Sequence, residues 1–227
     1  MDERLRLLIE LSQYQYDIPD VEVRRMITAL SNFFRAHLLS HDFPERGIRA
    51  IVTKFRDAGR RSAPWRPASG RVPGRPQDGA DGNRRSRWLF EPEHKYYASE
   101  VLATLVEVKY FLQTLSMADA PPLPADTIQE SFLWLTKHPV EPGVYRDPIQ
   151  RVPISLNSFM ADGRSVQSGH LVPLDRGGRH VPDNTFLMLA RSNQLQGNLT
   201  VGELLALMEQ IVRRHRQNEP EYLVTLD

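Results

Sequence analysis

Residues 167–200, QSGHLVPLDRGGRHVPDNTFLMLARSNQLQGNLT, contain the pattern that decides the fold of the C-terminal part of the chain. A Gly-His pair opens a short apolar run, a Gly-Gly pair follows, and an asparagine opens a second apolar run. Because paired glycines permit a sharp chain reversal, the pattern predicts a strand, a long turn, a second strand and then a short helix. His170 and Asn193 would then face each other across this small unit.

The composition excludes several classes of protein. The chain has 227 residues, of which 41% are apolar and 25% charged, as in an ordinary soluble globular protein. Its formal net charge is only +1, so any binding of nucleic acid must rest on local patches. Cysteine is absent, which excludes disulfides, thiolate zinc sites and cysteine nucleophiles. Arg4 and Arg6 interrupt any leader-peptide core and no apolar run has membrane-spanning length, so we expect a cytoplasmic protein without membrane contact.

The N-terminal part has helical periodicity. Apolar residues recur at helical spacing in residues 5–11, after Asp20 and in residues 48–55, and Asp20 is a candidate N-cap. We expect these helices to pack together without chemistry of their own. Residues 91–117 have the widest apolar face and predict the longest helix, which would serve either in the core or at a dimer interface.

Residues 56–90 predict an arginine-rich loop. Between Lys54 and Arg87 there are ten basic and three acidic side chains, and prolines and glycines interrupt regular structure. Such a loop could lie along a phosphate backbone, with Arg84, Arg85 and Arg87 as candidate DNA-binding residues. The alternative is a solvated linker that happens to be basic.

The pattern changes again toward the C-terminus. Three prolines make a stiff break before a short predicted helix over residues 127–137, and a final amphipathic helix begins at a capping box formed by Thr200 and Glu203. The sequence therefore predicts an α+β protein. Its parts are a mostly helical region over residues 1–120, a connecting helix and linker over 121–143, a small strand-containing domain over 144–216, and a tail over 217–227.

The chemistry of residues 167–200 fits hydrolysis of a phosphodiester. That reaction needs a base that deprotonates water and a divalent ion that stabilises charge on the phosphoryl and leaving oxygens. A neutral imidazole such as that of His170 suits the base near pH 7, and oxygen ligands suit Mg²⁺. Asn184 can hydrogen-bond across the turn and hold the strand of His170. Asn193, on the following helical turn, can direct its amide oxygen back toward His170.

Basic side chains flank these three residues. Arg176, Arg179 and Arg191 could hold a phosphate group of DNA. His180, in the turn, is expected at the surface or against a phosphate rather than as a second base.

The stretch resembles the HNH family of ββα-metal nucleases. Shared features are a base histidine, a proline shortly after it, a Gly-Gly turn, a structural asparagine and a closing asparagine before a polar-Gly pair. The upstream segment VYRDPIQR resembles the lead-in of many members, so the resemblance covers residues 144–216. It implies that His170 is the general base, Asn184 the loop-bracing residue and Asn193 the metal ligand. It also implies Mg²⁺, with Mn²⁺ as a substitute; no structural zinc is expected without cysteines.

The chain departs from the family at one position of the site. Many members have aspartate before the base histidine, where this chain has Gly169. Asp162, Asp175 and Asp183 are equal candidates for a second metal ligand. Without zinc, we expect the small domain to be held by apolar packing, with candidates Phe159, Leu174, Phe186, Leu189 and the last helix.

The resemblance, joined to the large helical region, implies an endonuclease that cleaves double-stranded DNA. The class expected is a type II restriction enzyme or another defence enzyme of the prokaryotic cytoplasm, acting as a homodimer with one active site for each strand. Two alternatives remain open: a catalytically inactive DNA-binding protein on the same fold, and a nonspecific or RNA-directed nuclease of the toxin type.

Overall fold

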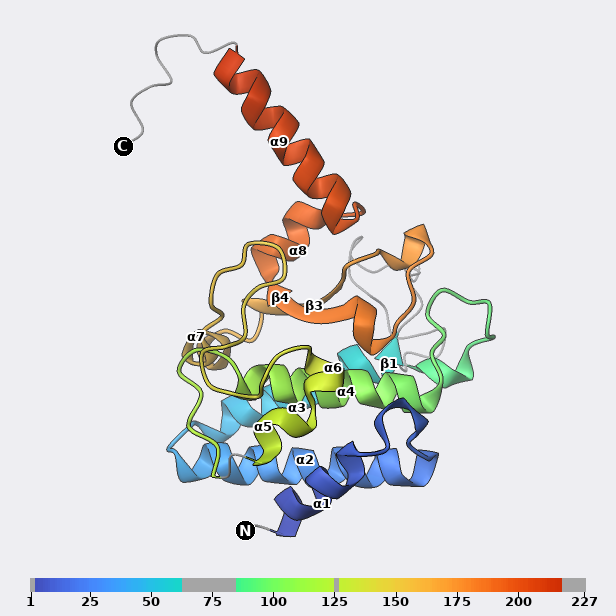
Figure 1. Cartoon of the computed structure of the whole chain (residues 1–227), viewed down its shortest axis with the longest axis vertical. Coiled ribbons are helices and arrows are strands. Elements are labelled where there is room, and N and C mark those ends of the chain that lie inside the picture. The colour runs from blue at the N-terminus through green and yellow to red at the C-terminus, as the bar shows by residue number, and fades with distance from the viewer. Residues whose placement is uncertain (1–2, 63–84, 125–126, 218–227) are drawn as a thin grey trace, which may run out of the picture.

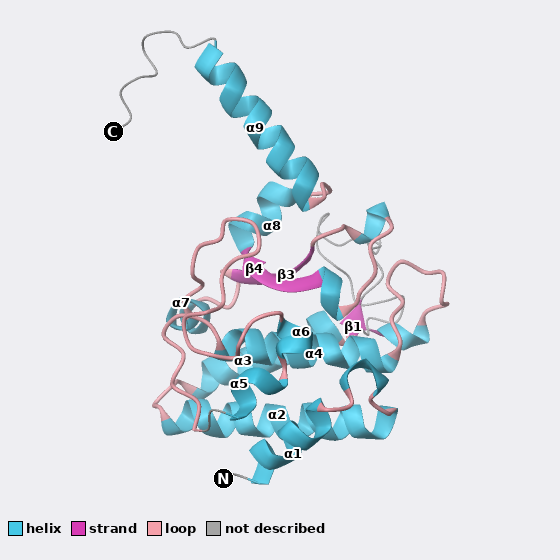
Figure 2. Ribbon diagram, viewed as in Figure 1, coloured by secondary structure: helices cyan, strands magenta, loops and turns pink. Residues whose placement is uncertain are grey.

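The structure, a computed structural model, describes residues 3–62, 85–124 and 127–217 (Figures 1 and 2). Its helices are α1 (Glu3–Ser12), α2 (Asp20–Ser40), α3 (Glu45–Gly59), α4 (Glu100–Leu115), α5 (Thr127–Ser131), α6 (Leu133–Thr136), α7 (Leu156–Ala161), α8 (Ala190–Gln196) and α9 (Val201–Gln217). Its strands are β1 (Arg61–Ser62), β2 (Arg85–Ser86), β3 (Val166–His170) and β4 (Thr185–Leu189). The described chain is thus mostly helical with two small antiparallel sheets, β1-β2 and β3-β4, which is compatible with the predicted α+β class.

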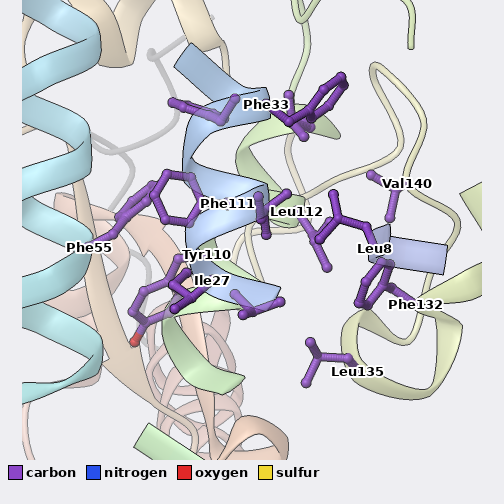
Figure 3. Close-up of a cluster of buried hydrophobic side chains, with 14 of the residues drawn as sticks. Leu8, Ile27, Phe33, Phe55, Tyr110, Phe111, Leu112, Phe132, Leu135 and Val140 are labelled. Carbon is purple, nitrogen blue, oxygen red and sulfur yellow. The ribbon is translucent and has the colours of Figure 1, made fainter. Parts of the chain in front are cut away.

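Helix α4 lies at the centre of the core. From Ala103 to Leu115 its side chains are buried on every face, including the polar side chains of Glu107, Lys109 and Gln113. The ring of Phe111 in α4 meets Phe55 of α3 with centroids 5.0 Å apart (Figure 3). It also meets Phe34 of α2 with centroids 4.9 Å apart. On its other side α4 contacts β4.

A single core therefore includes both the N-terminal helices and the strands. One cluster of buried apolar side chains extends from Leu5 of α1 to Leu187 of β4. This cluster crosses the predicted boundaries at residues 120 and 144, so the hairpin of β3 and β4 is built onto the helical part rather than held apart from it.

Several predicted helices begin or end elsewhere. Residues 91–99 form turns and irregular backbone, and α4 begins at Glu100, because the Ser99 hydroxyl accepts a hydrogen bond from the Leu102 amide and caps the helix there. The longest described helix is α2, with 21 residues. Asp20 is the first residue of α2 rather than its N-cap. At that position its negative charge interacts favourably with the helix dipole.

Of the remaining predicted elements, one helix is split and the capping box is present. The helix predicted over residues 127–137 is split at Phe132 into α5 and α6. The capping box is confirmed: the Glu203 carboxylate accepts from the Thr200 amide at 2.8 Å, and the Thr200 hydroxyl accepts from the Glu203 amide at 3.2 Å. Most of the predicted arginine-rich loop, residues 63–84, lies outside the described residues. The two ends of the predicted loop have regular secondary structure, because α3 continues to Gly59 and β1 pairs with β2.

Helix α9 projects from the body of the molecule (Figure 1). Leu204, at its base, is buried against Ile149 and Met188. The remaining large apolar side chains of α9 are between 41% and 53% exposed: Leu205, Leu207, Met208, Ile211 and Val212. The expectation that the last helix contributes apolar packing to the small domain is therefore wrong for all but its first turn. Within residues 3–62, 85–124 and 127–217, no helix is both long and apolar enough to cross a membrane.

Candidate active site

The strands β3 and β4 and the helix α8 form a ββα unit. The antiparallel register pairs His170 with Thr185 and Val166 with Leu189, and β4 continues directly into α8. Asn193 therefore returns on α8 to the side of the hairpin that carries His170. Both residues line one pocket of about 400 Å³, together with Asp175 and Gln196.

The amide of Asn193 is oriented by β3. Its Nδ2 donates a hydrogen bond to Oε1 of Gln167 at 2.8 Å, which leaves Oδ1 as the free acceptor. Gly169 provides the space beside that oxygen, because a Cβ at this position would lie 3.2 Å from Asn193 Oδ1 and 2.4 Å from Cε of Met188. The glycine that departs from the family pattern is thus closely packed against the candidate metal ligand.

Asn184 braces the loop between the two strands. Its Oδ1 accepts from the Val172 amide at 2.8 Å, and its Nδ2 donates to the carbonyl oxygens of Val172 and Arg179, each at 2.9 Å. These are the cross-turn hydrogen bonds expected from the sequence. The Gly-Gly pair is required for the same turn: Gly177 has φ +83°, and a Cβ on Gly178 would lie 2.0 Å from the Val172 carbonyl oxygen.

The site has further supports that the sequence pattern did not single out. The buried Asp147 accepts a hydrogen bond from the Leu189 amide at 2.8 Å and so fixes the end of β4. Gln150 donates to the Ser192 hydroxyl at 2.7 Å, and Gln196 donates to the His170 carbonyl at 2.7 Å. The signal was present, because Asp147 and Gln150 belong to the VYRDPIQR segment and Gln196 to the Gln-Gly-Asn sequence.

His180 corrects a prediction. It is not at the surface but 1% exposed, and its Nδ1 lies 3.1 Å from Nε2 of His170. Its own Nε2 lies 2.7 Å from the carbonyl oxygen of Gly59, at the end of α3. Burial, and then the nearby charge of Arg87, lowers the pKa of His170 to about 4, and the same two causes lower the pKa of His180 well below its usual value. Both imidazoles are therefore neutral at pH 7.

Arg87 is not available to DNA in this structure. It is 6% exposed, and its guanidinium donates to the backbone carbonyls of Ala58, Gly59 and Tyr96. Burial lowers its pKa to about 10, so it remains charged at neutral pH. It holds the carbonyl end of α3 beside His180. The prediction that Arg87 contacts a phosphate of DNA is therefore wrong.

The other candidate DNA-binding arginines differ in their surroundings. Arg85 and Arg191 are exposed, and Arg84 lies outside the described residues. Arg176 pairs with Glu203 at 2.8 Å, and Arg179 donates to the Pro92 carbonyl at 3.1 Å, although both residues remain exposed. These two arginines thus tie the loop between the strands to its neighbours while they face solvent.

A second hollow, of about 870 Å³, adjoins the site and was missed by the sequence analysis. It is lined by Arg46, Arg49 and Lys54 of α3 and by Gln167 and Ser168 of β3. Ser168 also lines the pocket of His170, so the two depressions meet at β3. Arg46 and Arg49 were overlooked because helical periodicity assigned their segment to packing, and Lys54 was counted only as the start of the arginine-rich stretch.

The three candidate second ligands occupy different places. Asp175 lines the pocket of His170 and Asn193, where it pairs with Lys95 at 2.5 Å. Asp162 instead accepts from the Arg164 amide, and Asp183 contacts Tyr16 and Lys137.

The pocket offers few side chains that could bind a metal ion. The described ranges contain no cluster of three or more histidine, cysteine, aspartate or glutamate side chains that could hold a metal. An amide oxygen with one carboxylate nearby suits Mg²⁺, which keeps several of its waters, and does not provide the closed ligand set of structural zinc.

The chain is similar in fold to solved structures. The chain superposes on a solved structure described as a type II restriction endonuclease with a TM-score of 0.46 and 19% sequence identity. The match covers 55% of this chain and 56% of that chain, so it spans little more than half of each. No protein-family model matches the sequence, and no curated protein matches it significantly.

Proposed function

We propose that this chain is a metal-dependent endonuclease that hydrolyses phosphodiester bonds of double-stranded DNA, on an HNH-type ββα-metal unit within residues 144–216. The observation that carries the proposal is the shared pocket of His170 and Asn193. One residue is a neutral imidazole, able to accept a proton, and the other has an amide oxygen left free by its bond to Gln167.

The proposed roles follow from the chemistry of each side chain. His170 accepts the proton of the attacking water, and its depressed pKa keeps it in the proton-accepting form throughout the neutral range. Asn193, with Asp175 as the second candidate, would hold Mg²⁺, or Mn²⁺ in its place. The bound ion would supply stabilisation of negative charge on the phosphoryl and leaving oxygens. Asn184 keeps the loop after His170 in place and does not react.

DNA is proposed to reach this pocket along the adjoining basic hollow. Arg46, Arg49 and Lys54 would neutralise phosphates along α3, and exposed arginines would continue the contact around the pocket. Those arginines are Arg85, Arg176, Arg179 and Arg191. Phosphate contacts of this kind position DNA without reading its sequence.

We also propose that the enzyme acts as a homodimer, as a type II restriction enzyme or another defence nuclease of the prokaryotic cytoplasm. The support is helix α9, whose exposed apolar side chains recur on the helix at positions 205, 208, 211 and 212. Glu203 lies in its first turn and Glu209 at its middle, and its last turn contains Arg214 and Arg216. In an antiparallel pair with a second copy, Glu203 of each helix would lie toward the basic end of the other.

The experiment that tests the proposed function is incubation of the purified chain with plasmid, bacteriophage and genomic DNA, with Mg²⁺ or with EDTA. Discrete fragments in Mg²⁺ alone support a sequence-specific endonuclease, and a smear supports a nonspecific one. Cleavage of RNA in preference to duplex DNA would mean that the substrate is RNA rather than DNA. Binding of DNA without cleavage in Mg²⁺ or Mn²⁺ would overturn the enzymatic proposal in favour of a DNA-binding protein.

A further inference from the structure

His180 has a hydrogen-bond arrangement that determines where its proton lies. Its Nε2 is 2.7 Å from the Gly59 carbonyl oxygen, which can only accept a hydrogen bond, so Nε2 must carry the proton. A neutral imidazole has one N–H, so Nδ1 of His180 is then a bare acceptor. Its neutral state is supported by its complete burial near the charge of Arg87.

The same argument determines which ring nitrogen of His170 carries the proton. Its Nε2 lies 3.1 Å from Nδ1 of His180, and since that atom is an acceptor, His170 must donate from Nε2. The opposite arrangement would turn a nitrogen lone pair of His180 toward the Gly59 carbonyl, or two bare nitrogens toward each other. Either contact leaves buried polar groups unpaired.

The acceptor that begins this relay is rigidly held. Gly59 ends α3, and a Cβ on it would lie 2.9 Å from both the backbone nitrogen and the Cβ of Glu107 in α4, so the two helices are in close contact there. The Gly59 carbonyl oxygen also accepts from Nε of Arg87 at 3.0 Å. The central helices therefore fix the direction of the hydrogen bonds that reach the hairpin.

We propose that His180 is a positioning residue that keeps the proton of His170 on Nε2 and leaves Nδ1 as the atom that takes the proton from water. The catalytic part of this inference rests on the proposed function. Among the residues that the structure describes, no hydrogen-bond partner contacts Nδ1 of His170, and the ring lines the pocket that also contains Asn193. His180 thus acts through His170 and touches neither substrate nor metal.

The test is to measure the tautomer of His170 directly, without DNA. Long-range ¹H–¹⁵N spectra of the histidine-labelled protein distinguish a protonated ring nitrogen from a bare one, and loss of one signal set in His170→Gln assigns the residue. The expected result is the Nε2–H tautomer of His170 in the parent chain. Finding Nδ1–H as the dominant tautomer would overturn the inference without any variant of His180.

Two variants of His180 separate positioning from packing. In His180→Asn, the amide oxygen can take the place of Nδ1 and still accept from His170. In His180→Gln, the amide nitrogen can take the place of Nε2, and the acceptor is lost. We expect His180→Asn to retain the Nε2–H tautomer of His170 and His180→Gln to give a mixture of both. Identical tautomer populations in the two variants and the parent would contradict the proposal.

The kinetic consequence is a change in kcat with little change in KM. His180→Gln should lower kcat by about 100-fold, which is within the range contributed by a positioned general base, and His180→Asn should restore most of it. Equal kcat values in both variants would contradict a positioning role. If the tautomer is as expected but the parent chain cleaves no DNA, the proposed function fails. The inference that His180 fixes the tautomer of His170 then still holds.

Discussion

Asn184 is hydrogen-bonded to both polar groups of the Val172 backbone. Its Oδ1 accepts from the Val172 amide at 2.8 Å, and its Nδ2 donates to the Val172 carbonyl at 2.9 Å. A third bond, to the Arg179 carbonyl, closes the loop between β3 and β4. The side chain thereby continues the pairing that the strands end at His170, and it holds the start of the loop whose Pro173 and Asp175 line the pocket.

Replacing Asn184 with alanine removes all three hydrogen bonds. Because each contributes on the order of 1 kcal/mol, we expect the free energy of unfolding to fall by about 2–3 kcal/mol, with reduced cleavage. Denaturant unfolding measures the first effect. Asn157→Ala, an exposed asparagine in α7, is the matched control and should change stability by no more than about 0.5 kcal/mol. Equal losses in the two variants would show that Asn184 does not brace the loop.

The depressed pKa of His170 makes stability depend on pH. Folded His170 resists protonation until about pH 4, because it is buried near Arg87, whereas an unfolded histidine takes up a proton near pH 6.5. Its contribution is therefore fully present above about pH 6.5 and is lost as the pH falls toward 4. Within this window the slope can reach about 1.4 kcal/mol per pH unit for one proton.

The measurement is the difference in unfolding free energy between the parent chain and His170→Gln at several pH values from 7 to 4. The parent should lose stability faster than the variant as the pH falls. His41→Gln, at an exposed histidine, should follow the parent. A parent-minus-variant difference that is constant with pH would contradict the buried, neutral state of His170.

Asn193 is expected to determine the requirement for metal. In Asn193→Ala, half-maximal cleavage should need at least about tenfold more Mg²⁺, since even outer residues of metal sites change affinity by that factor. Asn193→Asp supplies a carboxylate oxygen and should need no more than the parent. The control is Gln194→Ala, an exposed neighbour on α8. The ligand role is wrong if Asn193→Ala and Gln194→Ala have the same Mg²⁺ dependence.

Helix α9 is expected to hold two copies of the chain together. Met208 lies near the middle of its exposed apolar positions, so Met208→Glu would place like charges near each other in an antiparallel pair. Light scattering after gel filtration should give twice the 26.1 kDa chain mass for the parent and for Gln210→Glu, but the monomer mass for Met208→Glu. A parent chain that stays monomeric at micromolar concentration would rule out this interface.

Local patterns predicted the elements that depend on local chemistry. The hairpin, the Gly-Gly turn, the α8 position of Asn193 and the capping box of α9 all depend on residues close in sequence. The start of α4 was misplaced, because a continuous apolar pattern does not reveal that Ser99 caps the helix within it.

Long-range contacts were not predictable in the same way. His180 and Arg87 are polar residues in glycine-rich or basic surroundings, which normally indicate the surface. Both are buried because the carbonyl end of α3, far away in sequence, accepts their hydrogen bonds. Nor does an amphipathic pattern reveal whether a helix packs on its own chain, which is why the exposure of α9 was not expected.

The central claim is that His170 is the base of a DNA-cleaving site, and the most direct test is the rate of plasmid cleavage in Mg²⁺ by His170→Ala. We expect a rate lower by about 10²–10⁴-fold, the usual contribution of a general base, with the fold retained by circular dichroism and DNA binding in EDTA unchanged. His41→Ala, at an exposed histidine remote from the pocket, should cleave like the parent. Cleavage by His170→Ala at the rate of the parent chain would contradict the account.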